Sequence, residues 1–380
     1  MQKARIPLTN FQYGEISPSL VSRTDSAIYN SSAQSVKNFF IRTEGGVAKR
    51  GGFQALHDFT GVTEDTSIRQ QVRLIPFIFS DDEQYVIAFS HQKCEIFFIN
   101  PTTGALSLAT TLTQDVDGAS LQWDQAYLHE MTYAQGGDVL FVCHNTFMCQ
   151  QLVRTGLNSF QVEQFNFQLQ AGNARTYQPY YSFHATGVTL NPSASTGTGI
   201  TVTTSAAYFD TAGSQSGGNY PDSKHVGLTL LYHDSEILIT SVQSTTQATG
   251  NVVDELFVEL DPNSLRTIDG STTVEITHVN HGMTASDSIT LRNASGVGNI
   301  SASNLNGARS IQKIIDENRY TITAGGSANA TEDGGGNVQI VTHAPSKEWM
   351  EQSYSSLRGY PAAVGFHENR LWFGGTLAQP

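Results

Sequence analysis

The sequence predicts an all-β fold: a partial β-propeller with inserted small β-domains and an extended N-terminal strap. Three observations lead to this prediction. Only 14% of the 380 residues are charged, and glycine is abundant with 34 residues, which suits a chain rich in turns. Short aromatic and β-branched runs alternate with polar turn clusters. A similar phrase returns as YVIAFSHQ, GGDVLFVCHN and VGFHENRLWFGG, and the first two copies lie about 50 residues apart, within the range of propeller blades.

Residues 1–53 are expected to form the strap. The stretch from Asn10 to Phe53 is too rich in Gly, Ser and Pro for an ordinary helix, and it has too few neighbours to bury its own aromatic side chains. Pro18 favours an extended backbone before it. On an extended chain Arg23 and Asp25 would share a face. We expect this stretch to run extended over a propeller face or a neighbouring subunit, with Arg23 paired to an acidic group and Phe39 buried. The alternative is a mobile tail.

Two glycine pairs in the strap, Gly45-Gly46 and Gly51-Gly52, should frame a short strand at Val47–Arg50.

The stretch from Asn10 to Phe53 also carries a resemblance to a known family. The matching residues are Asn10-Phe11, Gly14-Glu15, Ser17-Pro18, Leu20, Arg23, Asp25, Tyr29, Asn38-Phe39, Gly45-Gly46 and Arg50-Gly51-Gly52. In this order they resemble the opening of the tail nozzle proteins of short-tailed bacteriophages, also called tail tubular protein B or phage stabilisation protein. The family usually has glycine where Ser22 stands, and Arg-Pro-Gly where Arg50-Gly51-Gly52 stands.

The resemblance implies a structural protein of the virion tail, synthesised in the bacterial host cytoplasm, and not an enzyme. Such a protein would be one of six copies in a nozzle ring that forms the DNA ejection channel. The ring would lie below the portal or adaptor ring, in the head–tail connection, and anchor tail fibres or spikes. No cofactor is expected. The residues expected at family-specific interfaces are Phe11, Gly14, Glu15, Ser17, Pro18, Arg23, Asp25, Tyr29, Asn38, Phe39, Gly45, Gly46 and Arg50.

The first propeller blades are expected in residues 54–177. The runs RLIPFIFS, YVIAFS, EIFFIN and ALSLATTL read as strands, separated by turns that include Pro101–Gly104. Leu121–Tyr133 is expected to hold at most a short turn of helix. The family resemblance also covers RLIPFIFSDDEQYVIAF, GGDVLFVCHNTF with Leu152 and Arg154, and YPAAVGFHENRLWFGG. Residues 346–380 should return to a blade. Family members continue further, so the sequence is expected to be a fragment or to take its remaining blades from elsewhere.

Two insertions are expected between the blades. Residues 178–270 form a Ser/Thr/Gly-rich β insertion, and residues 271–345 a small β-module whose part from Ser271 to Val341 should fold independently. The second resembles a module inserted into many phage tail proteins. The recurring features are His281-Gly282, Asp287 and Leu305-Asn306-Gly307, in which Asn-Gly is a natural tight-turn pair.

The net charge of −13 argues against a protein that grips DNA through clustered Lys and Arg. It is compatible with a channel through which viral DNA passes without specific binding. Asp81, Asp82 and Glu83 form the densest acidic cluster in a predicted turn, and they are the candidates for the channel wall. The alternative is a solvated hairpin turn that serves only solubility. The sequence has no apolar run of about 20 residues, so no direct membrane span is expected, and it shows no signal peptide.

Candidate catalytic and metal-binding groups are sparse. Cys94, Cys143 and Cys149 match neither a zinc spacing nor a disulfide framework. His278 and His281 are expected to point in different directions, which makes a metal site there improbable. Glu332-Asp333-Gly334 is expected to be a loop, and Trp123, Trp349 and Trp372 are expected in the core or an interface. The alternative function is a tail-associated protein that binds or depolymerises polysaccharide; cleavage would need paired carboxylates such as Asp81 and Glu83.

Overall fold

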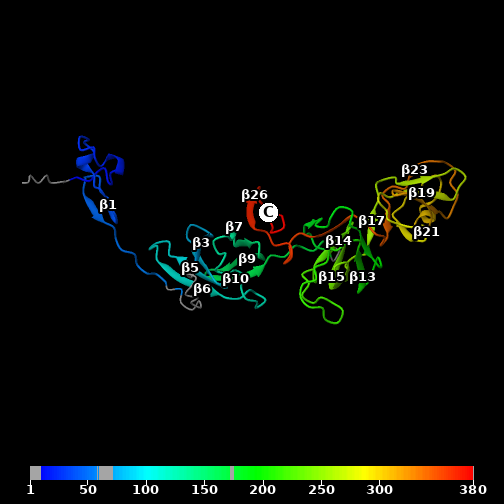
Figure 1. The fold of residues 1–380 in the computed structure, drawn as a ribbon, viewed down its shortest axis with the longest axis horizontal. Helices are drawn as coiled ribbons and strands as arrows, with labels where there is room; N and C mark the ends of the chain where they lie inside the picture. Colours follow the sequence, from blue (N-terminus) through cyan, green and yellow to red (C-terminus); the bar gives the residue numbers. More distant parts are fainter. Residues whose placement is uncertain (1–9, 58, 60–71, 172–174, 380) are drawn as a thin grey trace, which may run out of the picture. The chain divides into compact units, whose positions relative to one another are not determined.

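The computed structural model describes residues 10–57, 59, 72–171 and 175–379. The chain separates into two compact units, residues 1–63 and residues 64–380. The fold is all-β, as predicted: every pair of neighbouring strands is antiparallel. The α-helix that the described residues contain, α1, spans only Ala302–Leu305. Figure 1 shows the strands coloured along the sequence.

The N-terminal unit contains one short hairpin, β1 (Phe39–Ile41) and β2 (Val47–Lys49), so the strand predicted between the glycine pairs is confirmed. Ser17 has an extended backbone, with φ −57° and ψ 138°, as expected before a proline. The chain then coils. Two 3₁₀ turns, η1 (Pro18–Leu20) and η2 (Tyr29–Ser31), flank a run of turns in which backbone N–H groups donate to the carbonyl three residues earlier. Residues 18–31 are therefore not extended, because Pro18 and the Ser and Asp residues after it favour turns.

The second unit begins with two sheets of four strands, each a simple up-and-down meander. The first has the order β3-β4-β5-β6 and the second β10-β9-β8-β7. These are the predicted hairpin runs, and each sheet has the four-stranded form of a propeller blade. Their strands are β3 (Arg73–Ile78), β4 (Gln84–Ser90), β5 (Lys93–Ile99), β6 (Leu106–Leu112), β7 (Thr132–Gly136), β8 (Val139–His144), β9 (Phe147–Gly156) and β10 (Ser159–Gln164).

The turns of the first sheet follow the predicted chemistry. After β5, the Asn100 side chain accepts hydrogen bonds from the backbone N–H groups of Thr102 and Thr103, and Gly104 takes a positive φ of 66°. Asparagine is suited to such turns because its short side chain mimics a backbone carbonyl.

The segment Leu121–Tyr133 was expected to hold at most a short turn of helix. In residues 124–131, Met131 N bonds to Tyr127 O within a series of turns, so this part of the segment forms turns without a regular helix.

One hydrophobic core joins the two sheets. It contains Ile75 and Phe77 from β3, Leu140 and Val142 from β8, and the fully buried Trp123 between the sheets. The Phe77 ring lies edge to face on Phe160 of β10, with 5.4 Å between ring centroids, and Tyr85 lies 4.9 Å from the same ring. Edge-to-face aromatic pairs add to the stability that burial provides. The two sheets therefore stabilise each other as consecutive blades.

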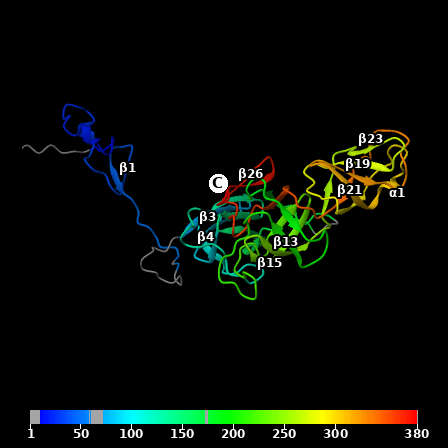
Figure 2. The same ribbon diagram turned by 45° about the vertical axis from the view of Figure 1, so that its right-hand side comes forward.

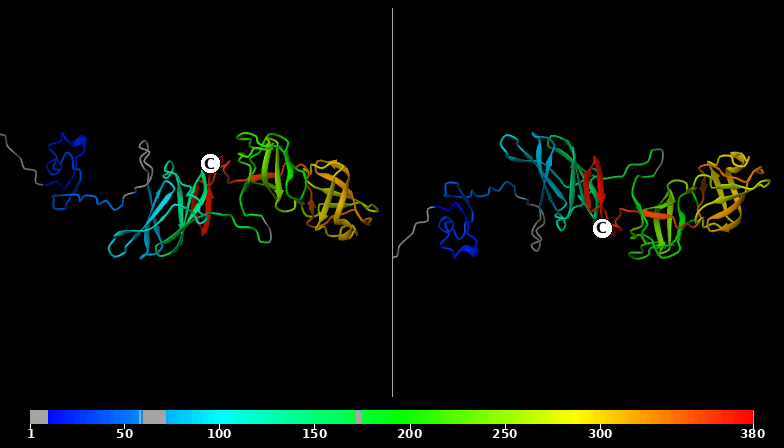
Figure 3. Two further views of the ribbon diagram at one scale, coloured as in Figure 1. Left: turned by 90° about the horizontal axis from the view of Figure 1, so that it is seen from below. Right: turned by 90° about the horizontal axis from the view of Figure 1, so that it is seen from above.

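A third hairpin, β26 (Ala363–His367) with β27 (Arg370–Gly374), packs beside β7 and β8. Figure 3 shows it in red next to the second sheet. Gly136 at the end of β7 permits this approach, since a Cβ there would lie 2.6 Å from Phe366 Cζ. Phe366 also meets Phe141 edge to face at 5.9 Å. This is the predicted return to a blade-like hairpin.

The first insertion is built on a seven-stranded sheet of order β11-β25-β14-β15-β16-β13-β12. Its core includes Leu230, Ile237, Ile239, Val202 and Trp349. Trp349 is buried and donates from Nε1 to the Val188 carbonyl at 3.0 Å. The strands are β11 (Tyr180–Tyr181), β12 (Leu190–Pro192), β13 (Ile200–Thr204), β14 (Thr229–Tyr232), β15 (Ser235–Ser244), β16 (Gln247–Val252) and β25 (Trp349–Gln352).

The second insertion is built on an eight-stranded sheet of order β17-β24-β20-β21-β22-β19-β18-β23, which Figure 2 shows together with α1. Gly282 follows His281 with φ +61°, and a Cβ there would lie 2.0 Å from Pro345 O, so only glycine fits this turn. The strands are β17 (Phe257–Glu259), β18 (Leu265–Thr267), β19 (Thr273–Thr277), β20 (Ser288–Arg292), β21 (Gly307–Asp316), β22 (Arg319–Thr323), β23 (Asp333–Gly334) and β24 (Gln339–Val341).

The insertions differ from the predicted boundaries in two places. β17 and β18 precede Ser271 but pair with β24, β19 and β23, and their Val258 and Leu265 enter the second core. β25 lies in the range assigned to the returning blade, yet it pairs with β11 and β14. All three strands are too short to show a periodic signal, so long-range pairing decides where they belong.

The first prediction concerns this boundary. A fragment of residues 255–343 should fold and give dispersed amide resonances, because it contains β17 and β18. A fragment of residues 271–341 should not fold, because it lacks Val258, Leu260 and Leu265. The side chains of these three residues lie in the core and are each less than 8% exposed. Comparing their NMR spectra tests this. A dispersed spectrum from the shorter fragment would show that the two strands are dispensable.

Candidate functional site: an N-terminal unit, an inter-blade ion pair and a polar cavity

The residues that resemble the nozzle family hold the N-terminal unit together through the backbone. Phe11 N donates to Gly45 O at 2.8 Å, Ala33 N to Gly14 O at 2.8 Å, and Arg50 N to Asn38 O at 2.8 Å. Glu15 receives a hydrogen bond on Oε2 from Val36 N at 2.9 Å. These bonds tie the turns to the hairpin without requiring buried apolar side chains.

Two glycines of the unit are required by close approach. Gly14 has φ +71°, and a Cβ there would lie 2.7 Å from Ile41 Cδ1. Gly45 has φ +89°, and a Cβ there would lie 2.4 Å from Asn10 Oδ1. Asn38 also has a positive φ, 63°, which asparagine tolerates better than most residues. The local fold therefore explains why glycine stands at positions 14 and 45 and asparagine at position 38.

The expected partner of Arg23 is its neighbour Asp25. Arg23 Nε and Nη2 donate to the two carboxylate oxygens at 2.8 and 2.9 Å, so the prediction of an acidic partner is confirmed. The guanidinium lowers the pKa of Asp25 through this hydrogen bond. Both side chains are well exposed, and pairs of this kind contribute little to stability in water. The pair lies within the run of turns, not along an extended strand.

Apolar side chains of the N-terminal unit lie on its surface. In the described part, residues 10–57, the buried residues are Gly14, Ser32 and Gly45, and no apolar side chain is buried. Phe39 is 48% exposed and Phe40 61% exposed, so the N-terminal unit does not itself bury Phe39, which was predicted to be buried. The exposed large apolar residues are Tyr13, Leu20, Val21, Ile28, Phe39, Phe40, Ile41, Val47, Phe53 and Leu56.

The other family-matching residues lie on the same small unit. Tyr29 begins η2 and is half-buried, as is Phe11, whereas Ser17, Pro18, Gly46 and Arg50 are exposed. The Arg50 guanidinium lies over the Phe53 ring, 4.5 Å from its centroid. All these residues therefore lie in one unit.

The acidic cluster in the turn between β3 and β4 divides into two parts. Asp81 and Asp82 are exposed. Glu83 is only 14% exposed in its side chain, and it accepts hydrogen bonds from Arg154 Nε and Nη2 at 2.6 and 2.8 Å and from Tyr85 Oη at 2.5 Å. Because Arg154 is on β9, this inter-blade ion pair joins the rims of the first two sheets.

Arg154 is itself held on three sides. Its guanidinium lies 3.9 Å from the centroid of the Phe79 ring, and Nη1 lies 3.2 Å from Asp138 Oδ1. The hydrogen bonds from Arg154 lower the pKa of Glu83 despite partial burial. Glu83 is therefore charged and compensated, so within the cluster only the charges of Asp81 and Asp82 are directed to solvent without such a partner in the described residues.

A second charged cluster is centred on a buried carboxylate in the first insertion. Glu351 on β25 has no exposed surface. It accepts hydrogen bonds from Arg358 Nε and Nη2 at 2.9 and 2.8 Å and from Tyr208 Oη, and His225 Nε2 lies 3.4 Å away. Burial would raise the pKa of Glu351, but the interactions with His225, Arg358 and Tyr208 outweigh it and lower the pKa to about 2. The carboxylate is stabilised in its charged form.

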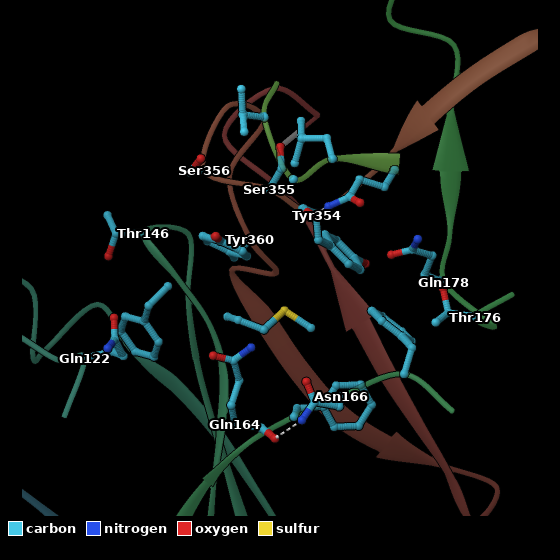
Figure 4. A pocket seen from close by; sticks show the side chains of 18 residues that line it. Gln122, Thr146, Gln164, Asn166, Thr176, Gln178, Tyr354, Ser355, Ser356 and Tyr360 are labelled. Carbon is cyan, nitrogen blue, oxygen red and sulfur yellow. Dashed lines mark hydrogen bonds between the residues drawn. The ribbon is translucent and has the colours of Figure 1, made fainter. Parts of the chain in front are cut away.

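A polar cavity of about 470 Å³ lies where β10 and the start of β9 approach the segment that follows β25. Figure 4 shows polar side chains around it, including Gln178 and Tyr354. Its walls combine side-chain amides, hydroxyls and aromatic rings, and no charged residue lines it among those the structure describes. The lining residues are Gln122, Thr146, Phe147, Met148, Gln164, Phe165, Asn166, Phe167, Thr176, Gln178, Val226, Gly227, Leu228, Gln352, Tyr354, Ser355, Ser356 and Tyr360.

The histidine pair of the second insertion converges, so the expectation that His278 and His281 point in different directions was wrong. Both are buried, their ring centroids lie 6.1 Å apart, and both contact Tyr320. His281 bonds through both ring nitrogens, Nδ1 to Met283 N and Nε2 to Asp316 O. Burial lowers the pKa of His278 to about 3. Both histidines therefore pack within the module, and the low pKa of His278 keeps its ring neutral at neutral pH.

The remaining sequence candidates have structural roles. Cys94, Cys143 and Cys149 are buried free thiols. Glu332 accepts a hydrogen bond from Gly298 N. The expectation of a loop at Glu332-Asp333-Gly334 was wrong for its last two residues, because Asp333 and Gly334 form β23 beside β18, where Asp333 also pairs with Arg266. Among the described residues no group of three or more His, Cys, Asp or Glu side chains is arranged to hold a metal ion. Within the same residues no helix is long and apolar enough to cross a membrane.

Sequence reasoning missed the Glu351 cluster and the polar cavity, and it did not pair Glu83 with Arg154. Glu83 and Arg154 are 71 positions apart, and Glu351 and Tyr208 are 143 apart. No local spacing signals such contacts. The one available sign was that Arg154 lies in a stretch that resembles the nozzle family.

Comparisons with known proteins identify no family. No family model matches the sequence, and no curated protein matches it. Among solved structures, the Phage phi92 endosialidase aligns with this chain at 9% sequence identity and a TM-score of 0.20. The match covers 72% of this chain and 28% of that chain, so this chain spans less than a third of the solved protein's length.

The second prediction concerns Glu351. Replacing it with Gln removes the charge that holds Arg358, and breaking such a buried pair should lower the free energy of unfolding by about 3 kcal/mol at neutral pH. The pKa of Glu351 falls from 4.5 to about 2 on folding. The stabilisation should therefore be fully present above pH 4.5 and lost as the pH falls to about 2.

Urea unfolding of the wild type and Glu351→Gln across this pH range measures the difference. Glu348→Gln is the matched control, since the Glu348 side chain is 56% exposed where it meets His233, and it should cost under about 1 kcal/mol. A difference for Glu351→Gln that does not change with pH would contradict the assignment.

Proposed function

We propose that this chain is a structural protein of a bacteriophage virion, a subunit of the tail nozzle ring through which the genome leaves. The observation that carries the proposal is the exposed apolar surface of the N-terminal unit, whose glycines and polar residues carry the sequence resemblance to the nozzle family. This unit buries no apolar side chain among residues 10–57, and it exposes ten large apolar ones. An exposed apolar surface of this kind is typical of a segment that packs on another protein.

The blades support a ring-forming role. Consecutive four-stranded sheets share one core, and the third hairpin leaves Phe366 45% and Trp372 55% exposed. We propose that six copies associate in the virion tail, with contacts to a portal or adaptor ring and to tail fibres or spikes. The chain is proposed to act as a conduit and not as an enzyme.

DNA passage in this proposal depends on weak repulsion. Two unit charges about 8 Å apart interact by only about 0.5 kcal/mol in water. A ring of identical subunits repeats each charge, so the small repulsions of the DNA add up. Asp81 and Asp82 remain candidates for the channel wall because they are exposed. Glu83 contributes less, since Arg154 compensates its charge.

A polysaccharide-cleaving function is less well supported. It would require two carboxyl groups that flank the bond to be cleaved. Of the pair considered from the sequence, Asp81 and Glu83, the second is engaged by Arg154 and Tyr85. The polar cavity has no carboxylate among its described lining residues.

The third prediction tests the ring. The purified chain, viewed by electron microscopy and weighed by mass photometry, should form closed rings with six-fold symmetry. Phe39→Ser/Phe40→Ser should prevent assembly, because it removes two exposed apolar side chains of the β1–β2 hairpin. A matched pair in the second insertion, Ile268→Ser/Val279→Ser, removes residues of similar exposure and should leave the rings intact.

A chain that stays monomeric at every concentration would contradict the proposed ring. Rings that form equally well with the Phe39→Ser/Phe40→Ser variant would instead show that the N-terminal unit takes no part in assembly.

A further inference from the structure

We propose that the polar cavity beside β10 binds a neutral saccharide without cleaving it. Its walls offer five side-chain amides, four Ser or Thr hydroxyls and five aromatic rings, and no acidic or basic side chain among the described residues. The inference does not depend on the proposed ring, because the whole cavity lies in residues 64–380.

The lining chemistry selects the ligand class. A phosphate or carboxylate ligand needs Arg, Lys or a helix N-terminus, and a cation needs carboxylates. A purely apolar ligand would leave the Thr176 hydroxyl and the unused acceptor and donor positions of the amides without partners, at a cost of about 1–3 kcal/mol for each unsatisfied group. A sugar suits both the polar and the aromatic parts of the wall. Its hydroxyls donate hydrogen bonds to amides and accept them from amides, and its C–H faces lie flat on aromatic rings.

The polar groups are placed to receive a ligand. Gln178 donates from Nε2 to Tyr180 Oη at 2.8 Å, and its amide is turned toward the cavity (Figure 4). The Thr176 hydroxyl oxygen is buried, and no hydrogen-bond partner is found for it in the described residues. Buried polar atoms are rarely left without a partner, so this hydroxyl marks a position that a ligand hydroxyl would satisfy.

The aromatic wall is held in place by its own packing. Tyr354 stacks on Phe167 with 6.1 Å between centroids and 9° between ring planes, and Phe165 packs edge to face on Phe373 at 4.9 Å. Tyr360 N donates to Asn145 O at 3.0 Å, which fixes the segment after β25 to the loop before β9. A site on fixed elements binds with less loss of conformational entropy.

The absence of carboxylates from the described lining separates binding from hydrolysis. Glycoside cleavage uses an acid and a second carboxylate on either side of the bond. Two carboxylates stand next to lining residues in the sequence: Glu351 bonds to Arg358, and Glu163 accepts a hydrogen bond from Gln161. The site is therefore expected to hold a sugar and leave its linkages intact.

The test uses the full chain and a panel of neutral probes: glucose, galactose, N-acetylglucosamine and their di- and trisaccharides, with glucuronic acid as a charged comparison. Isothermal titration calorimetry and saturation-transfer NMR should detect at least one neutral sugar and weaker binding of glucuronic acid. Asn166→Ala/Gln178→Ala should weaken that binding at least about tenfold, as expected for the loss of two hydrogen-bonding amides. Gln312→Ala, in the second insertion, is the matched control and should bind as the wild type does.

Thermal unfolding of each variant shows whether the variant keeps its fold. A second variant, Gln178→Glu, changes the size of the side chain very little. The negative charge that it adds to the cavity should also weaken binding of the neutral sugar. If no neutral sugar binds, if a neutral peptide binds in its place, or if the cavity variants bind normally, the proposal is overturned. Release of new reducing ends from the oligosaccharides would overturn the non-cleaving part.

Discussion

The packing of one four-stranded sheet on the next is the interaction on which the blade region depends. Neither sheet can bury its apolar face alone, and one core combines Phe77 and Tyr85 of the first with Leu140 and Phe160 of the second. The inter-blade ion pair of Glu83 and Arg154 lies at the rim of this core. The attraction between the apolar faces is non-directional, so it does not fix how one sheet is oriented on the other. The charged pair helps to fix this orientation, because a bidentate guanidinium–carboxylate contact forms in only one geometry. The third hairpin extends the same arrangement through Phe366 on Gly136.

The N-terminal unit is stabilised in the opposite way. Its turns are held by backbone hydrogen bonds and by glycines that allow close approach, while ten large apolar side chains, Phe39 and Phe40 among them, are exposed. Backbone bonds define a shape but contribute only about 1 kcal/mol each in water. A unit of this kind gains most of its stability when a partner covers its apolar surface. This is the physical basis for proposing that the chain works as part of an assembly.

Local features of the fold were predictable, whereas distant pairings were not. The hairpins from Arg73 to Leu112 followed from alternating runs and turn residues, and Asn100 and Gly104 behave as turn chemistry requires. β17 and β25 were assigned to the wrong segments because a three- or four-residue strand takes its place from its neighbours. His278 and His281 were expected to diverge, yet Tyr320 and burial bring them together. The cavity combines residues from Gln122 to Tyr360, and no spacing along the chain indicates such a set.

The most direct test of the account is hydrogen–deuterium exchange of residues 10–57 in the isolated chain and in the assembled particle. In the isolated chain these amides should exchange rapidly, because their hydrogen bonds are not shielded by an apolar core. On assembly, protection should rise across the β1–β2 hairpin and the turns before it, as Phe39, Phe40 and their neighbours become covered. Exchange that stays equally fast in the assembled particle would contradict the claim that this unit is an assembly surface.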